Sequence, residues 1–201
     1  MAIERGNAGL KGPRHTTIRT ERLLLRKPRP DDAESIFERY ASDPDVTKYV
    51  GWPRHTSIEQ TRSFLAFSES QWAEWPAGPY LIVSPSTGSL LGSTGLEFET
   101  TTRAQTGYVL ATDAWGRGYA TEALIAMRDL AQTLGVHRLY ALCHADHRPS
   151  ARVLEKGGMT FEGRLRRYAE FPNLGQGQPQ DVLCYAAILD FPSGTPEGNT
   201  P

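Results

Sequence analysis

The stretch WGRGYATEAL, residues 115–124, decides the fold of this chain. Two glycines, Gly116 and Gly118, flank the positive charge of Arg117, and an apolar run, GYVLA, precedes them at residues 107–111. Glycine permits positive φ and lets another group approach closely, because it has no Cβ atom. A helix that begins after such a turn offers unpaired N–H groups and a partial positive charge. The sequence therefore predicts a strand, a glycine turn and a helix N-terminus that together bind a phosphate or pyrophosphate.

Two nucleotide-binding templates do not fit this turn. A dinucleotide fingerprint requires G-x-G-x-x-G, but Thr121 stands at the third glycine position, and no acidic residue follows a second strand at the required distance. A Walker A loop requires Gly-Lys-Ser/Thr after a longer loop, and the sequence has no such tripeptide. The turn therefore belongs to another class of anion-binding loop.

The rest of the chain alternates between strand and helix patterns. Helices are predicted after Asp31, after Ser57 and after the glycine turn, and a fourth spans residues 146–158. Strand patterns occur at residues 22–27, 80–84, 90–99, 105–112, 137–144, 160–168 and 181–189. Strands joined by short turns run antiparallel, and strand–helix–strand units run parallel. We therefore predict an α/β (α+β) fold with a mixed central sheet of about seven strands and helices on both faces.

Length and composition fit one enzyme-sized domain. The 201 residues are 39% hydrophobic, enough for a core, and we expect a single domain at residues 18–191 between a flexible arm, 1–17, and a flexible tail, 192–201. The formal charge of −1 does not predict a nucleic-acid partner. No apolar run is long enough for a membrane span and no secretion signal is evident, so we expect no membrane partner and a cytoplasmic location. Cys143 and Cys184 lie in apolar runs and are expected to be free thiols.

Three motifs in order resemble one family. The turn fits the acyl-CoA loop Gln/Arg-x-x-Gly-x-Gly/Ala, with Gly118 and Ala120 at the small positions and Trp115 where Gln or Arg usually stands. GYVLATDAWGRGYATEAL resembles the RimJ/RimL-type branch of the GNAT N-acetyltransferases, the ribosomal-protein N-terminal acetyltransferases. HRPSARVLEKGGM and TERLLLRKPRPDDAESIF are similar to two further motifs of that branch, so the resemblance covers roughly residues 20–190. The chain is thus identified as a member of the GNAT superfamily, which implies the GNAT fold.

The resemblance also implies the co-substrate and how it is held. In GNATs the co-substrate is acetyl-CoA, and its pyrophosphate lies on N–H groups of the glycine turn. Pantetheine pairs like an added strand with the strand before the turn, so the backbones of Val109 and Leu110 are expected to bind it. The expected pyrophosphate-binding set is the turn itself: Trp115, Gly116, Arg117, Gly118, Tyr119, Ala120 and Thr121.

Acetyl transfer to an amine requires a neutral amine and a leaving thiolate that is protonated or tolerated. Ser150 matches a family serine that is thought to protonate the CoA sulfur, although a serine in a first helical turn can instead bond the backbone. His147 stands where the family has an Asn that commonly bonds pantetheine, and it is expected to keep that contact as a donor. The short spacing of His144 and His147 lacks a third ligand, so no metal site is predicted.

The sequence indicates the general base less clearly than the general acid. Glu97 and Glu99 lie on one face of a predicted strand, and we choose Glu97 because a carboxylate near the centre of the sheet can draw a proton through water. The alternative is a carboxylate on a solvated strand face. The family often has Glu where this chain has Gln105. His144, Asp146 and Tyr168 are lesser candidates.

Three functions stay open at this point. The leading one is acetyl-CoA-dependent N-acetylation of a primary amine, the α-amino group of a protein N-terminus, by direct attack in a ternary complex. The second is a small-molecule acetyltransferase for an antibiotic, a polyamine or an amino acid. The third is a CoA-binding module without catalysis. A monomer or a homodimer is expected, and the loops around Trp52 and at residues 173–179 are expected to select the acceptor.

Overall fold

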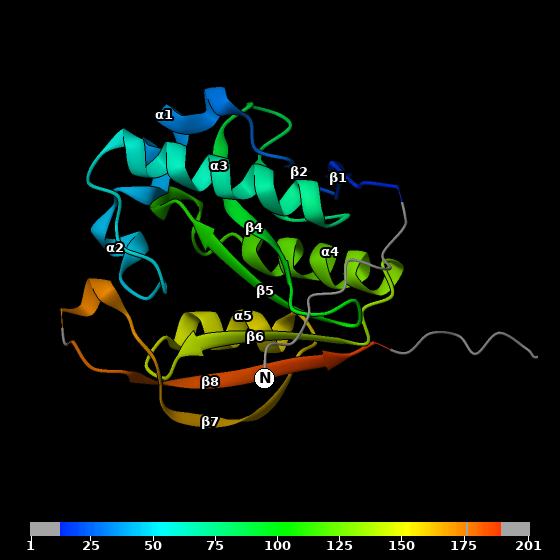
Figure 1. Cartoon of the computed structure of the whole chain (residues 1–201), viewed down its shortest axis with the longest axis vertical. Helices are drawn as coiled ribbons and strands as arrows, with labels where there is room; N and C mark the ends of the chain where they lie inside the picture. The colour runs from blue at the N-terminus through cyan, green and yellow to red at the C-terminus, as the bar shows by residue number, and fades with distance from the viewer. Residues whose placement is uncertain (1–12, 176, 190–201) are drawn as a thin grey trace, which may run out of the picture.

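The sheet of this protein has eight strands, as a computed structural model shows for the described residues, 13–175 and 177–189. Their spatial order is β1-β2-β3-β4-β5-β6-β8-β7 (Figure 1), and every neighbouring pair is antiparallel except β5 and β6. The strands are β1 Thr17–Arg19, β2 Leu24–Arg26, β3 Pro79–Val83, β4 Leu90–Phe98, β5 Arg103–Leu110, β6 Arg138–His144, β7 Thr160–Ala169 and β8 Gln180–Ile188.

Helices cover both faces of this sheet, as predicted. They are α1 Ala33–Ile36, α2 Pro44–Thr47, α3 Ile58–Glu74, α4 Tyr119–Thr133 and α5 Arg148–Lys156. Alternate residues of β3 show the two faces, because side chains of a strand point alternately to either side. Leu81 packs in the smaller apolar cluster with Ile36 of α1, whereas Ile82 packs in the larger one with Leu124 of α4 and Leu154 of α5. The sheet therefore lies between two layers (Figure 1).

The strand that the sequence did not predict, β1, lies where the expected N-terminal arm, 1–17, meets the expected domain. Thr17–Arg19 pairs with Leu24–Arg26, and the carbonyl of Thr16 accepts a hydrogen bond from the N–H of Lys27. Three residues are too few for a periodic pattern to show in the sequence. Residues 1–12 of the expected arm and the expected tail, 192–201, lie outside the described residues.

The strand–helix–strand rule holds for one unit, β5–α4–β6, whose strands pair in parallel. The next unit, β6–α5–β7, does not pair directly, because β8 lies between β6 and β7 and is antiparallel to both. The expected hairpin of the last two strands therefore inserts one of its strands into the sheet.

The parallel pair is short, and this creates the site. Only residues 103–105 of β5 pair with residues 138–140 of β6. Beyond this point β5 and β6 diverge toward their carboxyl ends (Figure 1). From Thr106 onward, β5 has no strand partner on that side among the described residues. Backbone N–H and C=O groups of this segment are thus directed into a gap in the sheet.

Candidate active site

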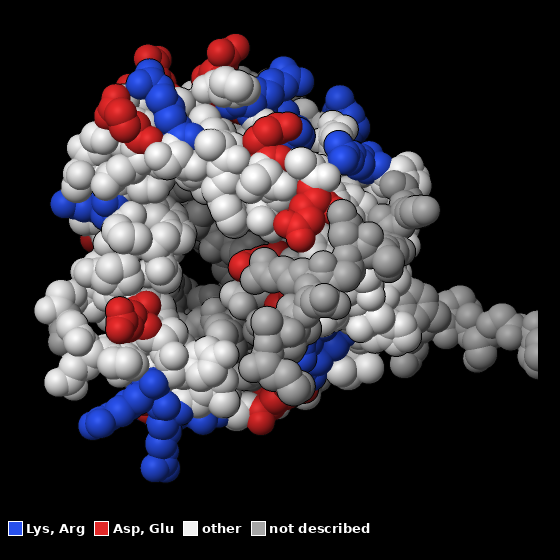
Figure 2. Space-filling model, viewed as in Figure 1, with Lys and Arg blue, Asp and Glu red and all other residues white. Residues whose placement is uncertain are grey.

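A large cavity occupies this gap and extends along the sheet. Its volume is about 1140 Å³, and it is lined by residues of β4, β5 and β6, the glycine turn, α5, and the segments that follow α2 and β7. Figure 2 shows the molecule hollowed between its α1–α3 side and its β6–β8 side. Ligand cavities for drug-sized molecules occupy about 300–1,000 Å³. This cavity therefore has room for an elongated ligand together with part of a second molecule.

The glycine turn forms one end of the cavity, and both glycines have left-handed backbones. Gly116 has φ 72° and Gly118 has φ 80°. Gly118 is the N-cap of α4 and offers no side-chain cap. The first N–H groups of α4 therefore remain available to an anion, as the sequence predicts. The positive φ values explain why glycine stands at these two positions.

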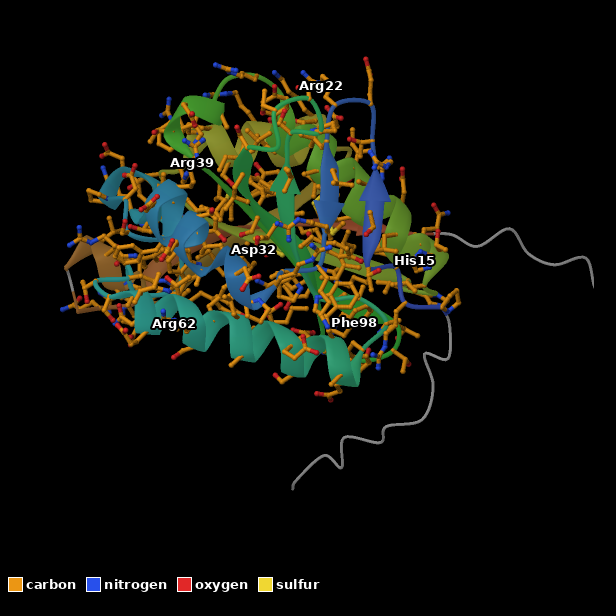
Figure 3. The ribbon with its side chains drawn as sticks, turned by 90° about the horizontal axis from the view of Figure 1, so that it is seen from above. His15, Arg22, Asp32, Arg39, Arg62 and Phe98 are labelled. Carbon is orange, nitrogen blue, oxygen red and sulfur yellow. The ribbon has the colours of Figure 1, made fainter. Side chains whose placement is uncertain are left out.

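Two arginines from outside the turn hold it in place (Figure 3). Arg22, between β1 and β2, donates to the carbonyl of Arg117 at 2.9 Å and to the carboxylate of Glu122 at 2.7 Å. Arg39 makes a two-pronged contact with Asp113, just ahead of the turn, at 2.7 and 2.9 Å. Sequence reasoning missed both contacts, because nearly 100 residues separate the partners in one case and 74 in the other.

Trp115 bonds back to the strand before the turn. Its indole Nε1 donates to the carbonyl of Leu110 at 2.8 Å, while about half of the side chain, 49%, remains exposed. The indole therefore joins the turn to β5 from the position where the family has Gln or Arg. It also occupies one acceptor on the open edge of β5.

On the open edge of β5, the backbone groups that face the gap belong to Tyr108 and Leu110 rather than to Val109. The N–H of Ala111 bonds Leu91 in β4, and the carbonyl of Arg103 accepts from Glu99, so odd-numbered residues of β5 face β4. The carbonyl of Val109 points at Gly92 of β4 in agreement with this alternation. Of the two backbone positions predicted to bind pantetheine, Leu110 thus faces the gap, and Tyr108 takes the place of Val109.

Ser150 lies across the gap from β5, near the start of α5. Its hydroxyl is 2.9 Å from that of Tyr108, which also lies 3.0 Å from the Ser150 carbonyl. Burial raises the pKa of Tyr108, although its hydrogen bond to Ser150 opposes the rise. Burial also raises the pKa of Cys143, which bonds Ser150, to about 11. Both neighbours are therefore protonated at neutral pH, and Ser150 lies in a chain of neutral donors.

His147 is the N-cap of α5. Its Nδ1 accepts a hydrogen bond from the N–H of Ser150 at 3.1 Å, as the oxygen of an Asn at this position can. A neutral imidazole that accepts at Nδ1 carries its proton on Nε2. Burial lowers the pKa of His147, so this neutral form is favoured. His147 is therefore a donor at the cavity wall.

We expect His147→Asn to reduce the pH dependence of stability. The pKa of His147 is lower in the folded protein than in the unfolded chain, so the folded state binds fewer protons in that interval. Stability is then complete above the ordinary pKa of about 6.5 and falls as the pH drops below it, by at most about 1.4 kcal/mol per pH unit. Asn keeps the cap without titrating. Urea unfolding at pH 7 and pH 5 measures the difference, and an unchanged slope in the variant contradicts it.

Glu97 lines the cavity where the β5–β6 gap begins. It is exposed and pairs across β4 and β5 with Gln105, which also lines the cavity. Glu99 instead accepts hydrogen bonds from Tyr140 and Arg103. Of the two carboxylates on this strand face, Glu97 is therefore the one placed to act in the cavity.

The lesser base candidates lie elsewhere or are occupied. His144 is buried, its Nδ1 accepts from the N–H of Asp146 at 3.1 Å, and burial lowers its pKa. Its ring contacts Tyr49 and Phe171, which line the cavity. Asp146 and Tyr168 are exposed and do not line the cavity. None of these three candidates lines the cavity, and His144 contributes to the site only by packing against Tyr49 and Phe171.

No group of three or more His, Cys, Asp or Glu side chains is arranged to hold a metal ion in residues 13–175 and 177–189. No helix in the same part of the chain is long and apolar enough to cross a membrane.

Comparisons with known proteins all find acetyltransferases. Residues 22–160 match the model described as acetyltransferase (GNAT) domain. The uncharacterized N-acetyltransferase p20 of Bacillus licheniformis is 33% identical over 175 residues, which are 86% of this chain and 96% of that protein. A GNAT-family acetyltransferase of Bacillus anthracis is 28% identical with a TM-score of 0.73, covering 86% and 98% of the two chains. RimL, a ribosomal L7/L12 α-N-protein acetyltransferase solved with coenzyme A, has a TM-score of 0.76, with 87% and 98% of the chains covered, but 22% identity shows a likeness of fold alone.

Proposed function

Because the chain belongs to the GNAT acetyltransferase family, it is an acetyl-CoA-dependent N-acetyltransferase, and we propose that its acceptor is an α-amino group, as at a protein N-terminus, which attacks directly in a ternary complex. The observation that carries this proposal is the gap between β5 and β6, which joins the glycine turn to a carboxylate, Glu97, in one cavity. Direct attack requires both reactants to be bound together, and one continuous cavity allows that.

The residues at the turn end suit acetyl-CoA. The N–H groups of Gly116, Gly118 and Ala120 provide donors for a pyrophosphate, and Arg152 and Lys156 of α5 add positive charge to the same cavity. On the open edge of β5, the backbone of Tyr108 and the N–H of Leu110 provide groups for an extended amide chain, since Trp115 occupies the Leu110 carbonyl, and the Nε2–H of His147 provides a further donor. Acetyl-CoA supplies the activated acetyl group there.

Proton transfers are assigned to Glu97 and Ser150. As the new C–N bond forms and the C–S bond breaks, Glu97 takes a proton from the amine through water. Ser150, whose hydroxyl lies 2.9 Å from that of Tyr108, donates its hydroxyl proton to the departing sulfur. Glu97 then releases its proton to solvent, and Ser150 takes one back from solvent, so that the products are the amide and the CoA thiol. A thiol with a pKa near 8.5 leaves readily, so the serine contributes less than the base.

We expect the effect of Glu97→Gln to report the class of amine. An α-amino group with a pKa of about 8 is roughly 10% neutral at pH 7, so loss of the base lowers kcat about tenfold at pH 7 and little at pH 9. A Lys-like amine with a pKa of about 10.4 is neutral in fewer than about one molecule in a thousand at pH 7. For such an acceptor, Glu97→Gln is expected to lower kcat at pH 7 by more than tenfold. The Kd for acetyl-CoA is expected to stay unchanged.

The test measures thiol release from acetyl-CoA with a panel of N-terminal peptides and small amines. Glu99→Gln is the matched control, because Glu99 is bonded to Tyr140 and Arg103 rather than directed into the cavity. An unchanged kcat of Glu97→Gln from pH 6 to pH 9 removes Glu97 from the mechanism. Binding of acetyl-CoA without acetylation of any amine favours the CoA-binding module.

A further inference from the structure

Aromatic rings from three separate segments form one wall of the cavity. Tyr49 and Trp52 come from the segment after α2, Phe64 and Phe67 from α3, and Phe171 from the segment after β7. Phe67 is 50% exposed although it lines the cavity. A half-exposed phenylalanine at a cavity wall gains free energy when an apolar ligand covers it.

Acidic side chains are few in the cavity. Asp45 and Glu97 are the acidic residues among the described residues that line it, and Lys48, which also lines it, has its Nζ 5.2 Å from the ring centroid of Tyr49. Figure 2 shows a mostly uncharged surface at the mouth of the hollow on this face. Such a site suits one ammonium group and does not suit a polycation, which requires several carboxylates.

Asn173 fixes two of the aromatic segments to each other. Its Nδ2 donates to the carbonyls of Thr47 and Trp52 at 2.7 and 2.9 Å, and its Oδ1 accepts from the N–H of Arg54 at 2.8 Å. The segment after α2 and the segment after β7 are thereby joined across the gap in the sheet. The positions of Tyr49, Trp52 and Phe171 are thus set before any acceptor arrives.

Two histidines pack against these rings. The ring centroid of Tyr49 lies 4.9 Å from that of His144 and 4.8 Å from that of His147. The ring of Phe171 stands edge-on to His144 at 4.8 Å and 84°. Rings held at these distances form a rigid wall, and rigid walls lower the entropy cost of binding a flat ligand.

We propose that the acceptor is a singly charged primary amine carried on a flat, apolar body, an aromatic ring above all. This inference rests on the proposed acetyl transfer and names the substrate class of the same cavity. Two sources share this chemistry, namely a free arylalkylamine and a peptide whose first residue is aromatic. Polyamines and polycationic antibiotics are outside it.

The test compares kcat/KM for acetylation at saturating acetyl-CoA. Phenethylamine and tryptamine represent the free source, a Phe-initiated tetrapeptide represents the peptide source, and n-butylamine, spermidine and an Ala-initiated tetrapeptide are the matched controls. We expect each aromatic acceptor to exceed its control by about 30-fold. The ratio between the free amines and the Phe-initiated peptide shows which source is preferred, and a preference for either supports the inference.

Two phenylalanines of equal exposure provide the matched variants. Phe67 lines the cavity at 50% exposure, whereas Phe161 of β7 is 51% exposed and does not line it. We expect Phe67→Ala to raise KM for the aromatic acceptor about fivefold, with kcat and the Kd for acetyl-CoA unchanged, and Phe161→Ala to leave all three unchanged. Equal effects of the two variants would overturn the assignment of this wall.

Different results of this experiment would contradict the aromatic acceptor and the acetyl transfer itself. Acetylation of butylamine or spermidine as efficiently as phenethylamine, together with equal rates for the two peptides, overturns the aromatic acceptor and leaves acetyl transfer intact. Bound acetyl-CoA with no turnover of any of the six acceptors overturns both.

Discussion

Gly92→Ala is expected to lower the free energy of unfolding by about 4 kcal/mol or more, the range of the most damaging single substitutions. Gly92 lies in β4 opposite Leu110, with φ 155°. A Cβ atom there would lie 2.0 Å from the carbonyl oxygen of Val109 and 2.8 Å from the Cα atom of Leu110. Both are backbone atoms, so β4 and β5 have to separate. The same shift displaces the open edge of β5.

The comparison uses a glycine with open surroundings. Gly88 has φ 72° in the turn between β3 and β4, and a Cβ atom there would meet nothing within 4 Å. Gly88→Ala is expected to cost about 1–2 kcal/mol, the strain of a left-handed backbone alone. Urea unfolding of both variants gives the difference. Equal losses in the two variants would show that the close approach of β4 to β5 is not what requires glycine at position 92.

Arg22→Ala is expected to weaken acetyl-CoA binding by about 30-fold, or about 2 kcal/mol. The helix turn proposed to bind the pyrophosphate also contains a carboxylate, Glu122. Burial alone would raise the pKa of Glu122, but hydrogen bonds from Thr20 and Arg22 outweigh it and hold the pKa below its ordinary value. Without Arg22, this ionised carboxylate repels the incoming anion, and the carbonyl of Arg117 loses its donor.

Calorimetry with CoA measures this loss, and two comparisons isolate its cause. Adding Glu122→Gln to Arg22→Ala removes the repelling charge and is expected to recover part of the affinity. Arg62→Ala breaks another surface arginine–glutamate pair, with Glu59 on α3, and is expected to leave the Kd unchanged (Figure 3). Pantetheine lacks the pyrophosphate, so an equal loss of its affinity in Arg22→Ala would contradict the electrostatic explanation.

The turn and its helix could be predicted because their signals are local. Gly116 and Gly118 indicate the turn, and the spacing of the apolar residues after them indicates α4. The turn alone predicted an anion site, and the resemblance of three motifs to the GNAT family then implied acetyl-CoA as the co-substrate. The orientation of Val109 could not be predicted, because a single residue of register decides whether a backbone carbonyl faces β4 or the gap.

Contacts between segments far apart in the chain could not be predicted from the sequence either. Arg22 reaches Glu122 across 100 residues, and Asn173 reaches Trp52 across 121. The aromatic wall shows the same limit. Tyr49, Phe67 and Phe171 give no common pattern along the chain, and they become a site only when the sheet brings their segments together.

The insertion of β8 between β6 and β7 also has a consequence for synthesis. Among the described residues, β7 pairs with β8 alone, so its backbone has no strand partner until residues 180–188 have left the ribosome. Until then, the edge of β6 that faces β8 and the backbone of β7 are both unpaired, and such edges promote association between chains. Val182 of β8 lines the cavity, so the cavity has its full lining only after β8 has entered the sheet.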